Sequence, residues 1–121
     1  MHVVVPIGPE AEWSEVRRFA HRFCAALAGL LPDRFTVALP KAQRRGRIFL
    51  DYLRNQRTAT AIMPWSLRAR DGAPVAVPVT WQELEEAESA VAMTIADSRA
   101  LATRARRLRG WGESDQALPS L

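Results

Sequence analysis

The carboxylate of Asp51 interrupts an apolar stretch at residues 47–54, where it is the first side chain that could do chemistry. A charged carboxylate among apolar neighbours is costly unless it is paired or binds a metal ion. Two interpretations therefore stand: Asp51 binds a divalent metal, or it forms an ion pair with a nearby arginine. The candidate partners are Arg44, Arg45, Arg47 and Arg54. Metal sites for phosphoryl transfer normally use several carboxylates, and no other predicted strand carries an Asp-x-Asp or Glu-x-Asp pair.

Three cationic or titratable side chains are candidates for binding phosphate. His2 precedes an apolar segment, and its imidazole could donate to a phosphate oxygen; the alternative is a structural histidine. Arg44 and Arg68 lie on either side of the Asp51 segment in the sequence and could reach a common pocket. The alternative for both arginines is a solvated surface position. A guanidinium suits phosphate because it binds two oxygens at once and keeps its charge.

The basic residues are unevenly distributed along the chain. Lys and Arg total 17 against 13 Asp and Glu, which gives a net charge of +4. Residues 34–70, which we call the basic field, contain nine basic residues and only one acid, Asp51. A second group of five arginines lies between Arg99 and Arg109. Clustered arginines favour a phosphate-containing partner, whereas a solvated basic surface is the alternative.

Length and composition exclude several classes of protein. The chain has 121 residues, enough for one domain, and its 48% hydrophobic and 25% charged content is typical of a globular protein. Its apolar runs are too short to span a bilayer, and the first residues do not resemble a secretory signal. With one cysteine, Cys24, and two histidines, zinc-finger and metalloprotease sites are excluded. We therefore expect a cytoplasmic protein without a disulfide.

Hydrophobic periodicity predicts both strands and helices. Between Trp13 and Leu30 the apolar side chains recur at intervals of three and four, which indicates an amphipathic helix. Thr80 and Glu83 form a capping box at the start of another helix. In chain order we predict a strand at 2–7, a helix at 10–31, strands at 47–54 and 58–63, a turn at 71–72, an extended segment at 75–79, and helices at 81–90 and 98–109. Residues 1–110 would form the domain and 111–121 a tail.

Several long segments resemble one known family. Residues 41–55 read KAQRRGRIFLDYLRN, residues 60–70 read TAIMPWSLRAR, and residues 2–7 read HVVVPI. Shorter agreements follow at 72–75 (GAPV) and 78–84 (PVTWQEL). In order and spacing these segments resemble the polymerase domain of bacterial DNA ligase D, a member of the archaeo-eukaryotic primase superfamily. The resemblance implies an α+β fold with a mixed β-sheet and packed helices, of which this chain covers the C-terminal part.

The resemblance also implies a function and site residues. It implies template-directed addition of nucleotides, preferably ribonucleotides, to DNA ends in non-homologous end joining, with Mn²⁺ or Mg²⁺ held by three aspartates. Asp51 matches the third of these, and His2 matches the histidine closing a Ser-x-x-Lys-Gly-x-His motif that contacts the triphosphate. Arg44 and Arg68 match triphosphate-binding arginines, and Arg54 occupies a variable position near the nucleotide. The implied partners are DNA ends, a nucleoside triphosphate, a ligase module and Ku, at the bacterial nucleoid.

The sequence departs from the family pattern at its start. The first two aspartates and the Ser and Lys of the histidine motif do not precede His2. We therefore expect a fragment with little polymerase activity alone, because one carboxylate cannot replace three at a two-metal site. It would complement a separately encoded N-terminal half, or be the product of a decayed gene. The rival hypothesis is a non-enzymatic protein that binds nucleic acid through the basic field, with affinity falling steeply in salt.

Overall fold

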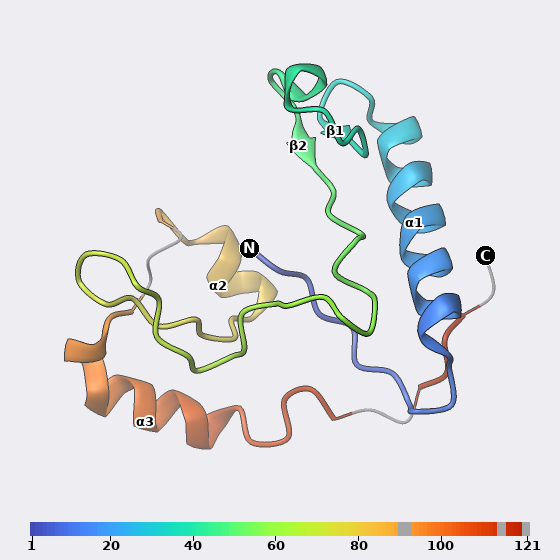
Figure 1. Ribbon diagram of the computed structural model, residues 1–121. Helices are drawn as coiled ribbons and strands as arrows, with labels where there is room; N and C mark the ends of the chain where they lie inside the picture. The colour runs from blue at the N-terminus through green and yellow to red at the C-terminus, as the bar shows by residue number, and fades with distance from the viewer. Residues whose placement is uncertain (90–92, 114–115, 120–121) are drawn as a thin grey trace. The chain divides into compact units, whose positions relative to one another are not determined.

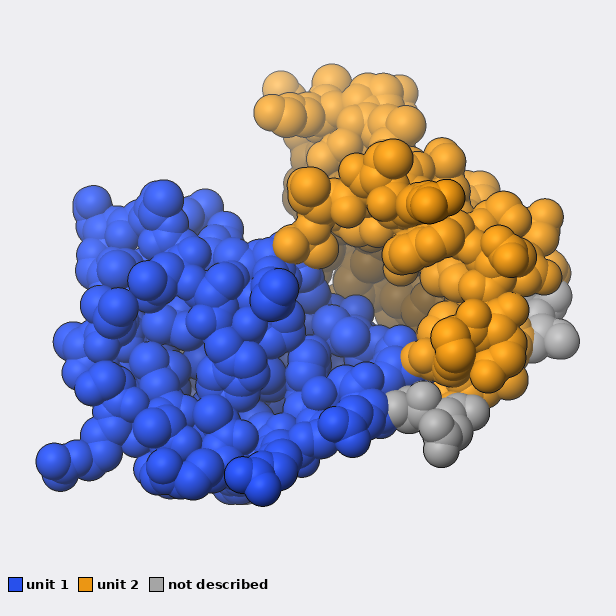
Figure 2. Space-filling model, turned by 60° about the horizontal axis from the view of Figure 1, so that its bottom comes forward, with its two compact units in different colours: residues 1–6, 62–113 blue, residues 7–61, 114–121 orange. Residues whose placement is uncertain are grey.

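The computed structural model describes residues 1–89, 93–113 and 116–119, and the chain divides into two compact units. Unit 1 comprises Met1–Pro6 and Ile62–Glu113, and unit 2 comprises Ile7–Ala61 and Ser114–Leu121 (Figure 2). None of the helices in the described parts of the chain is long and apolar enough to cross a membrane.

Unit 2 contains the long helix α1, which spans Trp13–Leu30 (Figure 1). Glu12 is the N-cap with an extended backbone (φ −69°, ψ 148°), and its N–H donates to the Glu15 carboxylate at 2.9 Å. The amide of Leu31 donates to the Leu27 carbonyl at 3.0 Å and closes the last turn. The helix predicted at 10–31 is confirmed, but it begins three residues later because the chain is still extended at Glu12.

Strands β1 (Phe35–Thr36) and β2 (Ile48–Phe49) form a parallel two-stranded sheet in unit 2, and α1 contacts β1 (Figure 1). Phe35 pairs with Ile48, and the 3₁₀ helix η1 (Lys41–Arg44) lies in the connection between the strands. The strand predicted at 47–54 is thus limited to two residues. The chain turns after β2, because the carboxylate of Asp51 accepts the N–H of Leu53 at 3.1 Å.

Unit 1 contains helices α2 (Trp81–Glu85) and α3 (Ser98–Arg107), with the 3₁₀ helix η2 (Ile95–Asp97) directly before α3. Two isolated antiparallel bridges, Leu67–Val75 and Pro74–Thr94, hold the segment that precedes α2. The predicted turn at 71–72 is confirmed: the Ala73 amide donates to the Arg70 carbonyl at 2.9 Å, and Gly72 has a φ of +78°. Glycine reaches such an angle without steric cost.

Helix α2 is shorter than the predicted 81–90, and residue 90 lies outside the described residues. Its capping box is confirmed: the Thr80 N–H donates to the Glu83 carboxylate at 2.8 Å, and the Glu83 N–H donates to the Thr80 hydroxyl at 3.2 Å. Carboxylates follow at Glu85, Glu86 and Glu88. Negative charge is unfavourable at a helix C-terminus, which explains the early end. Helix α3 agrees with the prediction at 98–109 except for its last two residues.

The α+β class is confirmed, but the predicted sheet is much reduced. Residues 2–7 and 58–63 are assigned to no strand, and of the extended segment at 75–79 only Val75 forms a bridge. Val3, Val4 and Val5 are 63%, 53% and 64% exposed. A β-branched segment becomes a strand only when a neighbouring backbone supplies hydrogen-bond partners. The strands predicted at 2–7 and 58–63 were based on residue composition alone, and both predictions were wrong.

No large apolar side chain is fully buried among the described residues. Trp13, Phe23, Leu30 and Ile48 are all more than half exposed, although the sequence pattern assigns them to apolar positions. Thr36 on β1 is 6% exposed, and its hydroxyl accepts the N–H of Ala38 at 3.1 Å. Local polar contacts and half-buried apolar side chains therefore stabilise each unit together.

The strongest of these polar contacts joins α2 to α3 through Glu83. The Arg104 guanidinium donates to both carboxylate oxygens at 2.8 and 3.0 Å, and Arg107 donates at 2.7 Å. Arg104 also donates to the Pro78 carbonyl at 3.0 Å. These hydrogen bonds, first that from Arg104 and then those from the Thr80 backbone and Arg107, hold the pKa of Glu83 well below its usual 4.5. The same carboxylate thus caps α2 and anchors α3.

We predict that Glu83→Gln lowers the free energy of unfolding by about 1 kcal/mol at pH 7, since charge-assisted hydrogen bonds are lost at a partly exposed site. The lowered pKa means that the carboxylate stabilises the fold above pH 4.5 and that this contribution falls as the pH drops below that value. Urea unfolding followed by circular dichroism should show the difference from wild type shrinking at acid pH. Glu85→Gln, an exposed change of equal charge on the same helix, is the control.

Candidate functional site

The predicted site residues divide between the two units. Arg44, Asp51 and Arg54 belong to unit 2, whereas His2 and Arg68 belong to unit 1. The structure brings Asp51 and Arg54 into direct contact.

Asp51 lies two residues beyond β2, at the start of a turn, and not in the middle of a strand as the sequence predicted. Its Oδ2 accepts the Arg54 Nε–H at 3.2 Å, and its Oδ1 accepts the Leu53 amide. Arg54 also donates to the Thr60 carbonyl. The side chains of Asp51 and Arg54 are 38% and 55% exposed. Of the two interpretations of Asp51, the structure contains the ion pair, with Arg54 as the partner.

Arg44 ends η1 and is half-buried against β2. Its Nε–H donates to the Ala38 carbonyl at 3.0 Å, and Nη2 donates to the Leu39 carbonyl. The guanidinium carbon lies 3.7 Å from the centroid of the Phe49 ring, a cation–π contact. A guanidinium has five N–H donors. The N–H groups on Nε and Nη2 that bond to the two carbonyls thus hold the Arg44 side chain in one orientation. Its remaining N–H groups can still donate to an anion.

His2 and Arg68 are both exposed in unit 1. Arg68 follows the bridge between Leu67 and Val75, and its backbone N–H donates to the Pro74 carbonyl at 2.8 Å. This hydrogen bond fixes the position of the Arg68 backbone and therefore of its Cα–Cβ bond. His2 lies in the segment of unit 1 that forms no strand.

The described residues do not form a metal site by themselves. They contain no group of three or more His, Cys, Asp or Glu side chains that could hold a metal ion. Cys24 on α1 lies near Asp51: burial raises the pKa of its thiol, and the negative charge of Asp51 raises it further. A thiol with a raised pKa gives up its proton less readily, and the thiolate is the form that binds a metal. The donor set consists of the single Asp51 carboxylate, which does not fit a divalent ion alone.

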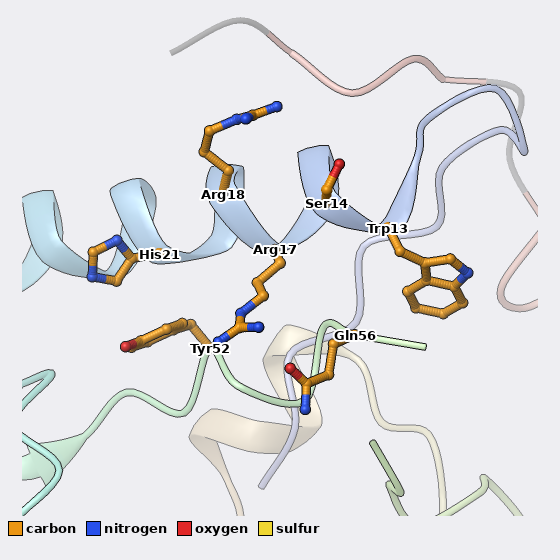
Figure 3. Close-up of a pocket in the computed structure, with 7 residues that line it drawn as sticks. All are labelled: Trp13, Ser14, Arg17, Arg18, His21, Tyr52 and Gln56. Atoms are coloured by element: carbon orange, nitrogen blue, oxygen red, sulfur yellow. The ribbon is translucent and has the colours of Figure 1, made fainter. Parts of the chain in front are cut away.

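A pocket on α1 was missed by the sequence reasoning. It has a volume of about 480 Å³ and is lined by Trp13, Ser14, Arg17, Arg18, His21, Tyr52 and Gln56 (Figure 3). The His21 and Tyr52 rings lie 4.5 Å apart between centroids, with their planes inclined by 56°. The available signal was the spacing of Trp13, Arg17 and His21 at four-residue intervals, which places all three on one side of a helix.

Comparison with solved structures defines the class of protein. The polymerase domain of Mycobacterium tuberculosis Ligase D, solved in complex with DNA, matches with a TM-score of 0.70 and 29% sequence identity. The match covers 80% of this chain and 32% of that one. The fold is therefore that of part of a ligase D polymerase domain.

The family model described as "LigD, primase-polymerase domain" matches residues 1–108. The chain belongs to this family. Among curated proteins, it is 43% identical over 90 residues to the multifunctional non-homologous end joining protein LigD of Pseudomonas aeruginosa. It is 34% identical over 88 residues to the protein of the same name from Mycolicibacterium smegmatis. These matches cover 74% and 73% of this chain but only 11% and 12% of the relatives.

We predict that Asp51→Asn changes the free energy of unfolding by less than about 0.5 kcal/mol, because the Arg54 pair is exposed and Asn retains an acceptor for the Leu53 amide. Asp51→Ala, which also removes that acceptor, should cost more. Thermal unfolding of both variants measures the difference. A large loss in Asp51→Asn would assign the carboxylate a structural role and contradict the expectation.

Proposed function

We propose that this chain forms the C-terminal portion of a LigD-type primase-polymerase domain that adds nucleotides, preferably ribonucleotides, to DNA ends in non-homologous end joining. The family match over residues 1–108 carries the proposal. Two further observations support it: the relatives are named for non-homologous end joining, and the solved neighbour was determined with DNA. The chain spans about a tenth of the length of these relatives. The activity, substrates and partners that follow are those of the whole proteins, and we propose that this chain shares in them.

In this proposal Asp51 contributes one carboxylate to a Mn²⁺ or Mg²⁺ site whose other ligands lie outside the described residues. The metal supplies charge neutralisation for the triphosphate when it is bound. The exposure of the carboxylate supports this role, because the Leu53 amide orients it while 38% of the Asp51 side chain stays accessible. When a nucleotide binds, the Arg54 guanidinium would release the Asp51 carboxylate and donate to the phosphates instead.

Arg44, Arg68 and His2 bind the triphosphate in this proposal. Arg44 is the best supported of the three, since its contacts with Phe49 and the Ala38 carbonyl hold the guanidinium still before any ligand binds. A guanidinium that is already ordered loses less side-chain entropy on binding a phosphate. The proposed partners are DNA ends, a nucleoside triphosphate, a ligase module, Ku and a complementary polymerase segment, at the bacterial nucleoid.

Isothermal titration of the chain with a ribonucleoside triphosphate, with and without Mn²⁺, tests this function. We expect saturable binding that requires Mn²⁺ and weakens about tenfold or more in Asp51→Asn, because a ligand to the metal is lost. Glu85→Gln, an exposed carboxylate on α2, should bind as wild type. Primer extension by the chain alone should be very slow, since one carboxylate does not complete a two-metal site.

Two results would contradict the proposal. One is a folded chain that binds no nucleotide with Mn²⁺ present. The other is triphosphate binding that persists after chelation of metal, is unchanged in Asp51→Asn and falls steeply with salt, which would favour the non-enzymatic basic protein.

A further inference from the structure

The groove beneath the first half of α1 combines aromatic rings with a guanidinium. Figure 3 shows the Arg17 side chain directed from α1 toward Tyr52 and Gln56, which lie in the turns after β2. The Trp13 ring projects from the first residue of α1 and is 54% exposed. Ser14 and Arg18 project toward the opposite side of the helix. The groove therefore places one cation between two exposed or half-exposed aromatic rings.

Charge indicates what this groove can bind. The Arg17 guanidinium extends into it, Arg18 borders it from the other side of α1, and none of the lining side chains is a carboxylate. His21 is packed against the Tyr52 ring, which restrains that ring on the floor of the groove. The amide of Gln56 can both donate and accept hydrogen bonds, as a nucleobase edge requires. A ligand that carries an anionic group and a flat apolar ring matches this arrangement.

We propose that this groove binds one nucleotide unit of a single-stranded nucleic acid, with a phosphate on Arg17 and an unpaired base stacked on Trp13. Bases offer a π-face for stacking whatever their sequence, and aromatic rings beside cations are the usual means of holding single strands. In a duplex both faces of each base are already stacked, so Trp13 selects for unpaired bases. The volume of about 480 Å³ is within the range of sites for molecules of nucleotide size.

This site is separate from the proposed nucleotide site. It uses neither Asp51 nor Arg44, and it needs neither a metal nor a triphosphate. Failure of one proposal therefore leaves the other standing. The groove would give the domain a contact with an unpaired strand independent of the residues proposed to hold the incoming nucleotide.

Fluorescence anisotropy of a labelled oligothymidylate, measured with the full chain at low salt in EDTA, tests the proposal. We expect Arg17→Gln to weaken binding about fivefold or more and to reduce the salt slope by about one, as for the loss of one phosphate contact. Arg22→Gln removes the same charge from the same helix but lies outside the groove, so it should change binding less than twofold. Equal effects of the two substitutions would overturn the proposal.

Substitution of the aromatic ring tests the stacking separately. Trp13→Ala should weaken binding of the oligothymidylate about fivefold or more. Trp111→Ala, a tryptophan 40% exposed in unit 1, should have little effect. A duplex competitor should displace the single strand poorly. Undiminished binding by a folded Trp13→Ala, effective competition by duplex, or absence of binding by the wild-type chain would each overturn the proposal.

Discussion

Each unit depends on polar contacts of short range beside apolar side chains that are at most half-buried, because no large apolar side chain among the described residues is fully buried. Glu83 is the clearest example: one carboxylate accepts from the Thr80 backbone, Arg104 and Arg107, and so connects α2 to α3. In unit 2 the corresponding restraints are the β1–β2 ladder and the carbonyl contacts of Arg44. Contacts of this kind depend on charge and geometry more than on buried area, so they fix local conformation at modest stability.

Restraints of the same kind act on two of the side chains proposed to bind metal and triphosphate. Asp51 is oriented by a turn amide and by Arg54, and Arg44 by two carbonyls and the Phe49 ring. Both side chains are therefore positioned without a ligand. Such preorganisation favours binding because less conformational entropy remains to be lost. An α+β unit with one prepared carboxylate and one prepared guanidinium is consistent with a portion of a LigD primase-polymerase domain.

Patterns that depend on neighbours in the sequence were read correctly. The helix α1 predicted from apolar intervals of three and four, the Thr80–Glu83 capping box and the turn at Gly72 are all present, because each is decided by contacts within about four residues. The strands at 2–7, 47–54 and 58–63 were overestimated. A strand forms only when a second strand supplies hydrogen-bond partners for its backbone, and residue composition does not specify whether that second strand is present. The α1 groove was missed for the same reason, since Tyr52 and Gln56 join it from another segment.

By itself the sequence determined the family, through long motifs in a fixed order, and from that family it predicted which residues bind phosphate or metal. It also determined where α1, α2 and α3 occur, and the Thr80–Glu83 cap of α2. Only the tertiary structure decided that Arg54, of four neighbouring arginines, pairs with Asp51, and that Arg44 packs on Phe49. These choices depend on how the chain turns after β2, because ion pairs and cation–π contacts require atoms within a few ångströms, and residue spacing alone does not fix such distances.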